Sequence, residues 1–349
     1  MTAYQLFRGL TGVDGELLAA AELVDSRKEL APKKLPARKI WLVAAVIALA
    51  LLLCMLFSCA LAEDARYGQV YDTAQDAGRL TVRYLWLGPQ VADDKPGDCM
   101  ILTSPDGKIM VLDAGHPQAT QYIIAALDAM GVKKIDYLVA SHPHIDHIGG
   151  MAALMDRYEV GIHYSTELWH TTNTYKGYVA AIERNHIEQV YLHEGDSFMF
   201  GDQVTVYVYN PEAEISYYAD YPKSGTQFMN NHSLVLKFVY GDSSFLMAGD
   251  LYSTGETDVV KRWGDALHAD VIKANHHGLD TSNSPKWRKT VNPDITVITN
   301  DLLGSVFVAQ KYARNGKQMY HIFLDGDVRV STAGDGEYEV LTGKDRQTD

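Results

Sequence analysis

Cysteine is scarce in this chain of 349 residues, which contains three, and two of these lie in one apolar run. Only Cys99 remains for the folded part, so a small domain held together by a disulfide framework is excluded. Internal repeats and low-complexity tracts are also missing, which excludes a repeat array. Hydrophobic residues make up 47% of the chain and charged residues 21%, so wholesale disorder is excluded as well.

Long apolar runs are almost absent, and the one exception covers residues 40–62. Its 23 residues carry no charge, and that length is enough to cross a bilayer as a helix. Six basic residues and one acidic residue precede it within residues 27–39. This excess of positive charge predicts that residues 1–39 are a cytoplasmic arm and that residues 63–349 lie outside the cell.

Three fates are open to this apolar segment. The small residues before Glu63 resemble a signal-peptidase site, and cleavage after Ala62 would release a secreted domain. Residues 56–59 resemble a lipoprotein box, although Phe57 is bulky where a small residue is usual. The 39 residues ahead of the apolar core are long for a secretory signal, so we expect a retained signal anchor in the cell membrane.

Basic residues are the minority among the charges outside the membrane. Residues 63–349 hold 24 basic and 39 acidic residues, which leaves a net charge of −15. This charge repels nucleic acid at long range unless metal ions or local lysines offset it, so nucleic acid is an alternative partner only. Within this part we expect a stalk at residues 63–78 and one folded domain at residues 79–349.

Strands and helices alternate through the folded domain. Helical spacing of apolar residues predicts helices at 118–132, 149–158, 174–187 and 254–264. Apolar, β-rich runs predict strands at 79–87, 98–115, 134–142, 203–211, 232–250, 269–278, 294–300 and 318–341. The last of these reads as a hairpin that turns at Asp325 and Gly326. The expected fold class is α/β (α+β), with two sheets flanked by helices rather than one doubly wound sheet.

The stretch SHPHIDHIGG, at residues 141–150, crowds four metal-binding side chains into six positions: His142, His144, Asp146 and His147. The first two histidines alternate along an extended strand, so their side chains face the same way. The aspartate and the third histidine follow where the strand gives way to a helix, and they address a second point nearby. Histidines with one carboxylate suit zinc, with manganese or iron as alternatives.

Three more predicted strands end in residues that would complete a site for two metals. Asp250 ends the stretch LMAGD, and its carboxylate is suited to bridge two ions. His276 and His277 end the stretch IKANHHG. Asp113 ends VLDAG, where it is placed to orient a metal ligand rather than to be one. Each residue alone has an ordinary structural explanation, but the four strand ends together predict a metal centre.

The order DAG, HPHxDHxGG, GD and HHG resembles the metallo-β-lactamase superfamily. Within it, the likeness is to the hydrolase domain of ComEC/Rec2-type competence proteins and their secreted relatives. The stretches GDCMILTSPDGKIMVLDAG, NNHSLVLKFVYGDSSFLMAGD and ADVIKANHHGLDTSNSP resemble that group, and the likeness covers about residues 79–340. It implies an αββα sandwich with a two-metal hydrolase site at one edge of the sheets.

The resemblance also implies which residues hold which metal. Metal one would take His142 and His144, and metal two would take Asp146 and His147. Asp250 would bridge, and one of His276 and His277 would complete metal two while the other touches substrate. Asp146, His276 and His277 are therefore the expected catalytic residues.

The third ligand that many relatives have on metal one has no clear counterpart in this chain. The candidates are Asn231 and His232, with Asn230 beside them. The family's Gly-Gln-Gly-Asp loop is replaced by the longer GPQVADDKPGD, and the late Asn-x-Tyr-Gly-His stretch appears only as NDLLGSVF. These departures weaken an assignment to nucleic acid more than they weaken the fold.

The ligand set predicts metal-assisted hydrolysis. Two divalent cations, zinc first, lower the pKa of a shared water, so hydroxide is available near neutral pH. The first expected substrate is a small or polymeric phosphodiester, in nucleic acid or in a cell-envelope phosphoester. A lactone, thioester or β-lactam hydrolase is the alternative, and a catalytically silent binding module is a third reading. Lys273 and Ser282 are expected to contact an anionic substrate, or else to form a salt bridge and a helix cap.

Overall fold

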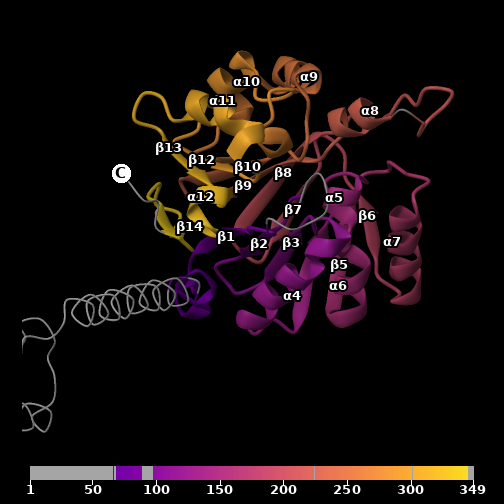
Figure 1. The fold of residues 1–349 in the computed structure, drawn as a ribbon, viewed down its shortest axis with the longest axis horizontal. Helices are drawn as coiled ribbons and strands as arrows, with labels where there is room; N and C mark the ends of the chain where they lie inside the picture. The colour runs from indigo at the N-terminus through magenta and orange to yellow at the C-terminus, as the bar shows by residue number, and fades with distance from the viewer. Residues whose placement is uncertain (1–65, 67, 89–96, 224, 301, 345–349) are drawn as a thin grey trace, which may run out of the picture. The chain divides into compact units, whose positions relative to one another are not determined.

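Side chains of the first strands alternate between two separate cores, and this alternation sets the layers of the domain. The structure, a computed structural model, describes residues 66, 68–88, 97–223, 225–300 and 302–344. In β2 (Met100–Thr103), Met100 and Leu102 face the core between two sheets, whereas Ile101 faces a core beneath helices. The order of layers is therefore helices, sheet, sheet, helices (Figure 1).

The two sheets hold all the strands of the described residues. The eight-stranded sheet has, in spatial order, β15 (Glu339–Thr342), β14 (Val328–Thr332), β1 (Leu80–Tyr84), β2, β3 (Ile109–Leu112), β4 (Lys134–Val139), β5 (Glu159–Ser165) and β6 (Gln189–Tyr191). The seven-stranded sheet has β13 (Gln318–His321), β12 (Ile295–Ile298), β11 (Val271–Lys273), β10 (Ser243–Met247), β9 (Val235–Tyr240), β8 (Val204–Asn210) and β7 (Ser197–Phe200). Each sheet mixes hairpins with parallel pairs.

Helices cover the outer face of each sheet (Figure 1). The eight-stranded sheet packs on α4 (Thr120–Ala129), α6 (Met151–Arg157) and α7 (Asn173–Arg184), and the other sheet on α9 (Ser253–Trp263), α10 (Pro285–Val291) and α11 (Leu302–Tyr312). The short remaining helices are α5 (Ile145–Ile148), α8 (Thr226–Asn231), α12 (Ile322–Asp325), η1 (Thr73–Gln75), η2 (Pro117–Ala119), η3 (Gly264–Leu267) and η4 (Asn275–Gly278). The expected sandwich of two sheets between helices is confirmed.

The last predicted hairpin is wrong. β13 lies at the edge of the seven-stranded sheet and pairs in parallel with β12, whereas β14 lies in the other sheet and pairs with β1. The chain crosses between the sheets through the single-turn helix α12 and through Gly326, whose φ of 67° is left-handed. An Asp-Gly turn signal is local, so it marks the change of direction but not the partner strand.

The domain also begins earlier than expected. Asp76, in the predicted stalk, is buried between two arginines that stand opposite each other on β1 and β14. Its carboxylate pairs with Arg83 at 2.8 Å and with Arg329 at 3.1 Å. Like charges directly opposite in a sheet repel each other, so this segment folds back to neutralise them.

The predicted cytoplasmic arm and the predicted membrane span, residues 1–39 and 40–62, lie outside the described residues. Within the part of the chain that the structure describes, no helix is long and apolar enough to span a bilayer.

Candidate metal centre

The predicted site residues follow two pairs of neighbouring parallel strands, one pair in each sheet. β3 leads to Asp113 and β4 leads to the histidine cluster, while β10 leads to Asp250 and β11 to the two late histidines. Parallel strands end at the same edge of a sheet, and here the two sheets bring these edges together. The fold therefore gathers residues that are far apart in sequence.

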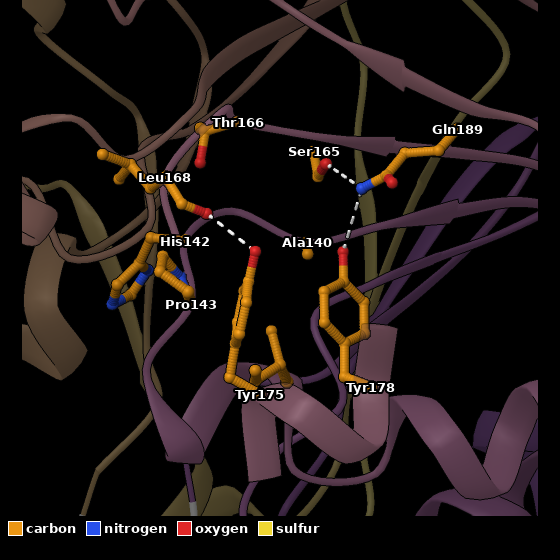
Figure 2. A pocket seen from close by; sticks show the side chains of 10 residues that line it. Ala140, His142, Pro143, Ser165, Thr166, Leu168, Tyr175, Tyr178 and Gln189 are labelled. Atoms are coloured by element: carbon orange, nitrogen blue, oxygen red, sulfur yellow. Dashed lines mark hydrogen bonds between the residues drawn. The ribbon is translucent and has the colours of Figure 1, made fainter. Parts of the chain in front are cut away.

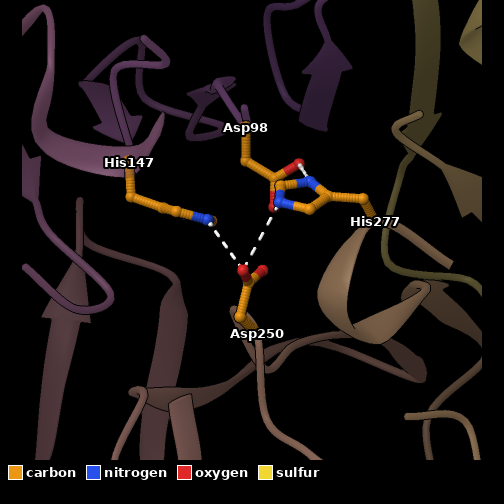
Figure 3. A group of neighbouring side chains, drawn as sticks. All are labelled: Asp98, His147, Asp250 and His277. Carbon is orange, nitrogen blue, oxygen red and sulfur yellow. Dashed lines mark hydrogen bonds and ion pairs between the residues drawn. The ribbon is translucent and has the colours of Figure 1, made fainter. Parts of the chain in front are cut away.

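Four buried residues meet most closely, and we call them the four-residue group: Asp98, His147, Asp250 and His277. One ligand atom from each lies within 4.8 Å of the others. The Oδ2 atom of Asp250 is 3.2 Å from Nε2 of His147 and 3.4 Å from Nε2 of His277. Figure 3 shows both ring nitrogens pointing at this carboxylate from opposite sides.

Both histidines of this group are held from behind by a second carboxylate. Nδ1 of His147 lies 2.8 Å from Oδ2 of Asp113, and Nδ1 of His277 lies 2.9 Å from Oδ1 of Asp98. Lys273 is fully buried and forms an ion pair with the other oxygen of Asp98. A carboxylate on Nδ1 fixes the ring orientation and keeps Nε2 free for a ligand, as in carboxylate–histidine–zinc arrangements.

We assign Asp98 as a residue that orients His277 and Asp146 as a metal ligand. Both oxygens of Asp98 are engaged, one by His277 and the other by Lys273. Asp146 instead faces the centre, with Oδ2 at 3.5 Å from Nε2 of His277 and 4.0 Å from Nε2 of His147. The side chains that converge are therefore Asp146, His147, Asp250 and His277.

The electrostatics of the group are those of a strongly coupled cluster. Burial opposes protonation of His147, but Asp250 first and then Asp113 hold the pKa of this imidazole well above its ordinary value. The pKa of His277 is raised in the same way, against burial, by Asp250 and Asp98. Conversely, the pKa of Asp250 is lowered by the two histidines despite its burial. Fixed negative charge thus surrounds the two rings.

The group fits a divalent metal ion. Nε2 of His147, Nε2 of His277 and Oδ1 of Asp250 are buried and have no hydrogen-bond partner within the described structure. Buried polar atoms without partners are rare and costly in folded proteins. Imidazole nitrogens and carboxylate oxygens facing one point at these spacings match the ligand chemistry of zinc and its neighbours.

His142 and His144, which we call the histidine pair, lie beside the group. Nε2 of His142 and Nδ1 of His144 approach to 2.8 Å, and Nε2 of His142 is 3.9 Å from Oδ2 of Asp250. Two ligands of one tetrahedral zinc ion are about 3.3 Å apart, so the pair is placed to share an ion. Burial first lowers the pKa of His144 to about 4, which leaves this imidazole neutral and able to bind metal at neutral pH.

A small cavity lies behind the ring of His142, and Figure 2 shows its polar lining. Gln189 donates to Ser165 at 2.9 Å and approaches the hydroxyl of Tyr178 at 3.5 Å. The cavity measures about 10 Å³, which is room for about one water. The cavity is too small for a substrate.

Close backbone contacts explain two glycines of the site. Gly97 has a φ of 79°, and a Cβ atom there would lie 1.7 Å from the carbonyl oxygen of Asp146. A Cβ at Gly149 would lie 2.4 Å from Pro117, next to the loop that carries Asp113. These contacts let the loops of Asp98, Asp113 and the histidine cluster stack together.

The late histidines sit on a strained loop that a buried glutamate organises. His276 and His277 have φ values of 49° and 53°, a left-handed conformation that side chains with a Cβ rarely adopt. Glu256 accepts hydrogen bonds from Asn275 and from the backbone of Asn283 and Ser284. Strain of this kind persists where the surroundings over-determine it, commonly at functional sites.

Geometry separates the two late histidines. Nε2 of His277 lies 3.5 Å from Asp146 and 3.4 Å from Asp250, whereas Nε2 of His276 lies 3.7 Å from Asp250. The ring of His276 packs on Tyr252, with centroids 4.8 Å apart. The geometry therefore favours His277 over His276 as a metal ligand.

The structure does not bring the predicted third ligands of metal one into the centre. Oδ1 of Asn231 accepts from the backbone of Gly255 at 3.2 Å, at the start of α9. His232 bonds the carbonyl of Phe228 at 2.7 Å and packs on that ring. The rotation of α8 about its axis decides where the side chains of Asn231 and His232 point, because residues one position apart on a helix face about 100° apart.

The two predicted substrate contacts are also wrong. Lys273 is completely buried against Asp98, so a substrate cannot reach it. Ser282 is 4% exposed and turned inward, and the cap of α10 is Ser284, which accepts from the backbone of Trp287. The alternative expectation of a salt bridge holds for the lysine.

Sequence reasoning missed Asp98, Glu256 and His170. Asp98 ends the loop that stands where relatives have Gly-Gln-Gly-Asp, so its position was visible as a signal. Glu256 lies on the buried face of α9, and the sequence around it does not distinguish it from an ordinary exposed glutamate of a helix. His170, from a distant loop, lies 6.5 Å from the ring of His144.

The chain is similar in sequence to known proteins. Residues 92–213 match the model of the metallo-beta-lactamase superfamily. Over 201 residues the chain is 29% identical to competence protein ComA of Neisseria gonorrhoeae, which covers 57% of this chain and 25% of the relative. Over 228 residues it is 26% identical to ComE operon protein 3 of Bacillus subtilis, covering 58% and 27%. The chain thus spans about a quarter of the length of these relatives.

A diphosphatase from the PhnP family is 15% identical, with a TM-score of 0.44, and the match covers 75% of this chain and 99% of that one.

Proposed function

We propose that this chain carries a metallo-β-lactamase superfamily domain and that it is a metal-dependent hydrolase that cleaves a phosphodiester. The observation that carries the proposal is the convergence of two carboxylates, Asp146 and Asp250, with the buried ring nitrogens of His147 and His277. Such a convergence is costly without a cation, and it serves no packing purpose. The resemblance to ComEC/Rec2-type hydrolase domains supports the choice of a phosphodiester over a lactone or thioester.

Two metal sites share the bridging carboxylate in this proposal. His142 and His144 would hold one ion, and Asp146, His147 and His277 would hold the other. Asp250 would contact both ions. When bound, divalent ions supply Lewis acidity and lower the pKa of a water at the site.

The chain's own residues would orient and protect this chemistry. Asp113 and Asp98 keep a proton on Nδ1 of His147 and His277, so that each Nε2 faces the centre, where a bound cation would replace the proton on that nitrogen. His276 and Tyr252 pack on each other beside His277, and the substrate would lie against them in this proposal. None of these roles needs a nucleophilic serine or cysteine.

A direct test compares hydrolysis of a chromogenic phosphodiester, a lactone and a β-lactam by the soluble domain. We expect two transition-metal ions per chain after metal-replete purification, and phosphodiester turnover that is lost on chelation and restored by zinc or manganese. Preference for the lactone would establish the alternative substrate class. Two bound ions without turnover of any substrate would favour a binding module.

We also propose that the domain is held outside the cell by a membrane anchor at residues 40–62. The support is the charge asymmetry of the sequence, with six basic residues just ahead of the apolar run. Protease added to intact cells should remove the domain and spare the N-terminal arm. A protected domain would reverse the proposed orientation.

A further inference from the structure

A second concave site lies on the far side of the seven-stranded sheet from the metal centre. It is an open cleft of about 340 Å³ between α10, the end of α11 and the start of β13. Figure 1 shows α10 and α11 together on the outside of the sheet, beside β12 and β13. The cleft residues Pro293 and Lys317 lie two residues before β12 and one residue before β13, so they are at the amino ends of these strands. The metal centre lies at the carboxyl ends.

The cleft is basic although the protein is acidic. Five of its lining residues are cations: Arg288, Lys289, Lys311, Arg314 and Lys317. Residues 285–317 contain six basic and two acidic residues, whereas the whole chain has a net charge of −13. Cations at the ends of α10 and α11 offset the helix dipoles, but one per helix end would suffice for that purpose. The excess points to a ligand.

Most of these cations are free to bind. Within the described part of the chain, Lys289, Lys311 and Arg314 have no ion-pair or hydrogen-bond partner for their side chains. Lys317 pairs with Asp294. Arg288 is anchored through Nε to the carbonyl of Asn283 at 3.1 Å, which leaves its terminal nitrogens available.

The floor of the cleft is rigid. Tyr312 is 5% exposed, and its hydroxyl donates to Asn283 at 3.0 Å. The guanidinium of Arg288 lies 6.0 Å from the centre of this ring, within reach of a cation–π contact. A cation held by both a hydrogen bond and a ring loses little freedom when an anion binds, so binding is favoured.

We propose that this cleft binds a small molecule carrying two or more phosphate groups. Arginine and lysine together suit phosphate oxygens, since guanidinium binds two oxygens at once and ammonium acts as a point charge. The volume falls at the lower end of sites for small ligands. A concave site of this size favours a compact anion over a membrane surface. The proposal does not depend on the reaction at the metal centre.

The test measures binding of inorganic tripolyphosphate to the whole domain by calorimetry. Lys311→Gln with Arg314→Gln should weaken binding by about tenfold or more, because two charge-assisted contacts are removed. The matched control is Lys133→Gln with Lys176→Gln, two exposed lysines of the other sheet's side, which removes the same charge. The control should change the affinity by less than about twofold, and neither variant should change hydrolysis or the melting temperature.

Three outcomes would overturn the proposal. Equal binding of tripolyphosphate to the cleft variant would place the anion at the metal centre. Equal weakening of binding by the control would reduce the effect to net charge. Tighter binding of a short single-stranded oligonucleotide or of phosphatidylglycerol vesicles than of tripolyphosphate, through the same two residues, would make the surface a polyanion or membrane contact.

Discussion

The two halves of the metal centre differ in how firmly the protein holds them. In the four-residue group, each histidine has a carboxylate behind it, and one of these carboxylates has its own buried lysine. In the histidine pair, Nδ1 of His142 meets the neutral hydroxyl of Ser141 at 3.0 Å, and His144 contacts the rings of His142 and His170. Carboxylates therefore orient the histidines of one half directly, whereas neutral groups contact those of the other.

The difference has a consequence for metal binding. A ligand whose orientation is fixed in advance loses less freedom when an ion binds, and a carboxylate on the second ring nitrogen raises its basicity. We therefore expect the ion beside His147 and His277 to bind more tightly than the ion at the histidine pair. Stepwise removal of metal with a chelator should release the ion at the histidine pair first and the ion beside His147 and His277 second.

Asp250 is the residue that joins the halves, so its loss should have the largest effect. Its Oδ2 atom lies between 3.2 and 3.9 Å from a ring nitrogen of His147, His277, His276 and His142. Asp250→Ala should lower hydrolysis by on the order of a thousandfold and release at least one ion. Asp242→Ala, an exposed aspartate in the adjoining hairpin turn, is the control. Two ions with near-normal turnover in Asp250→Ala would refute the assigned centre.

Substitution of Lys273 tests the buried ion pair with Asp98 that lies behind His277, in the half of the centre that we expect to bind metal more tightly. Lys273→Met leaves Asp98 buried with only His277 to offset its charge, and breaking a buried ion pair costs about 3–5 kcal/mol of unfolding free energy. Denaturant unfolding measures this loss. The exposed Lys261→Met should stay within about 0.5 kcal/mol of the parent. Equal stability of the two variants would show that the lysine is not needed to balance the carboxylate.

Removing the whole charge pair separates stability from metal binding. Asp98→Asn combined with Lys273→Met should recover most of the lost stability, because no buried charge is left unpaired. It should still weaken one of the two ions by about 10–100-fold, since His277 loses its carboxylate. Metal titration of the double variant against the parent checks both halves of the centre. Unchanged affinity for both ions would make Asp98 a purely structural residue.

Asn231 and His232 should have the smallest effect, because the structure turns both away from the centre. Asn231→Ala and His232→Ala should each keep two ions, with affinities within about twofold of the parent. The asparagine variant should lose about 1 kcal/mol of stability, the worth of its hydrogen bond to Gly255. Loss of an ion from either variant would restore it as the third ligand of the histidine pair.

The fold could be predicted from the sequence where the local pattern of apolar residues agrees with the contacts that the segment makes in the folded domain. The helices near 118–132, 149–158, 174–187 and 254–264 all form, because an apolar stripe with a defined face needs only some core to bury it. The prediction failed at residues 318–341, where two strands were right but their pairing was wrong. Strand pairing depends on sequence-distant neighbours that a local pattern does not name.

The sequence by itself determined the chemistry of the centre. His142, His144, Asp146 and His147 lie on one short stretch, so local chain geometry alone points them at two neighbouring places. The tertiary structure decided which other residues reach those places. Asp98 and His277 stand 179 positions apart and meet only because two sheets close on each other. Lys273 likewise became a buried counter-charge rather than a substrate contact, because burial is a property of the packed fold and not of the residue type.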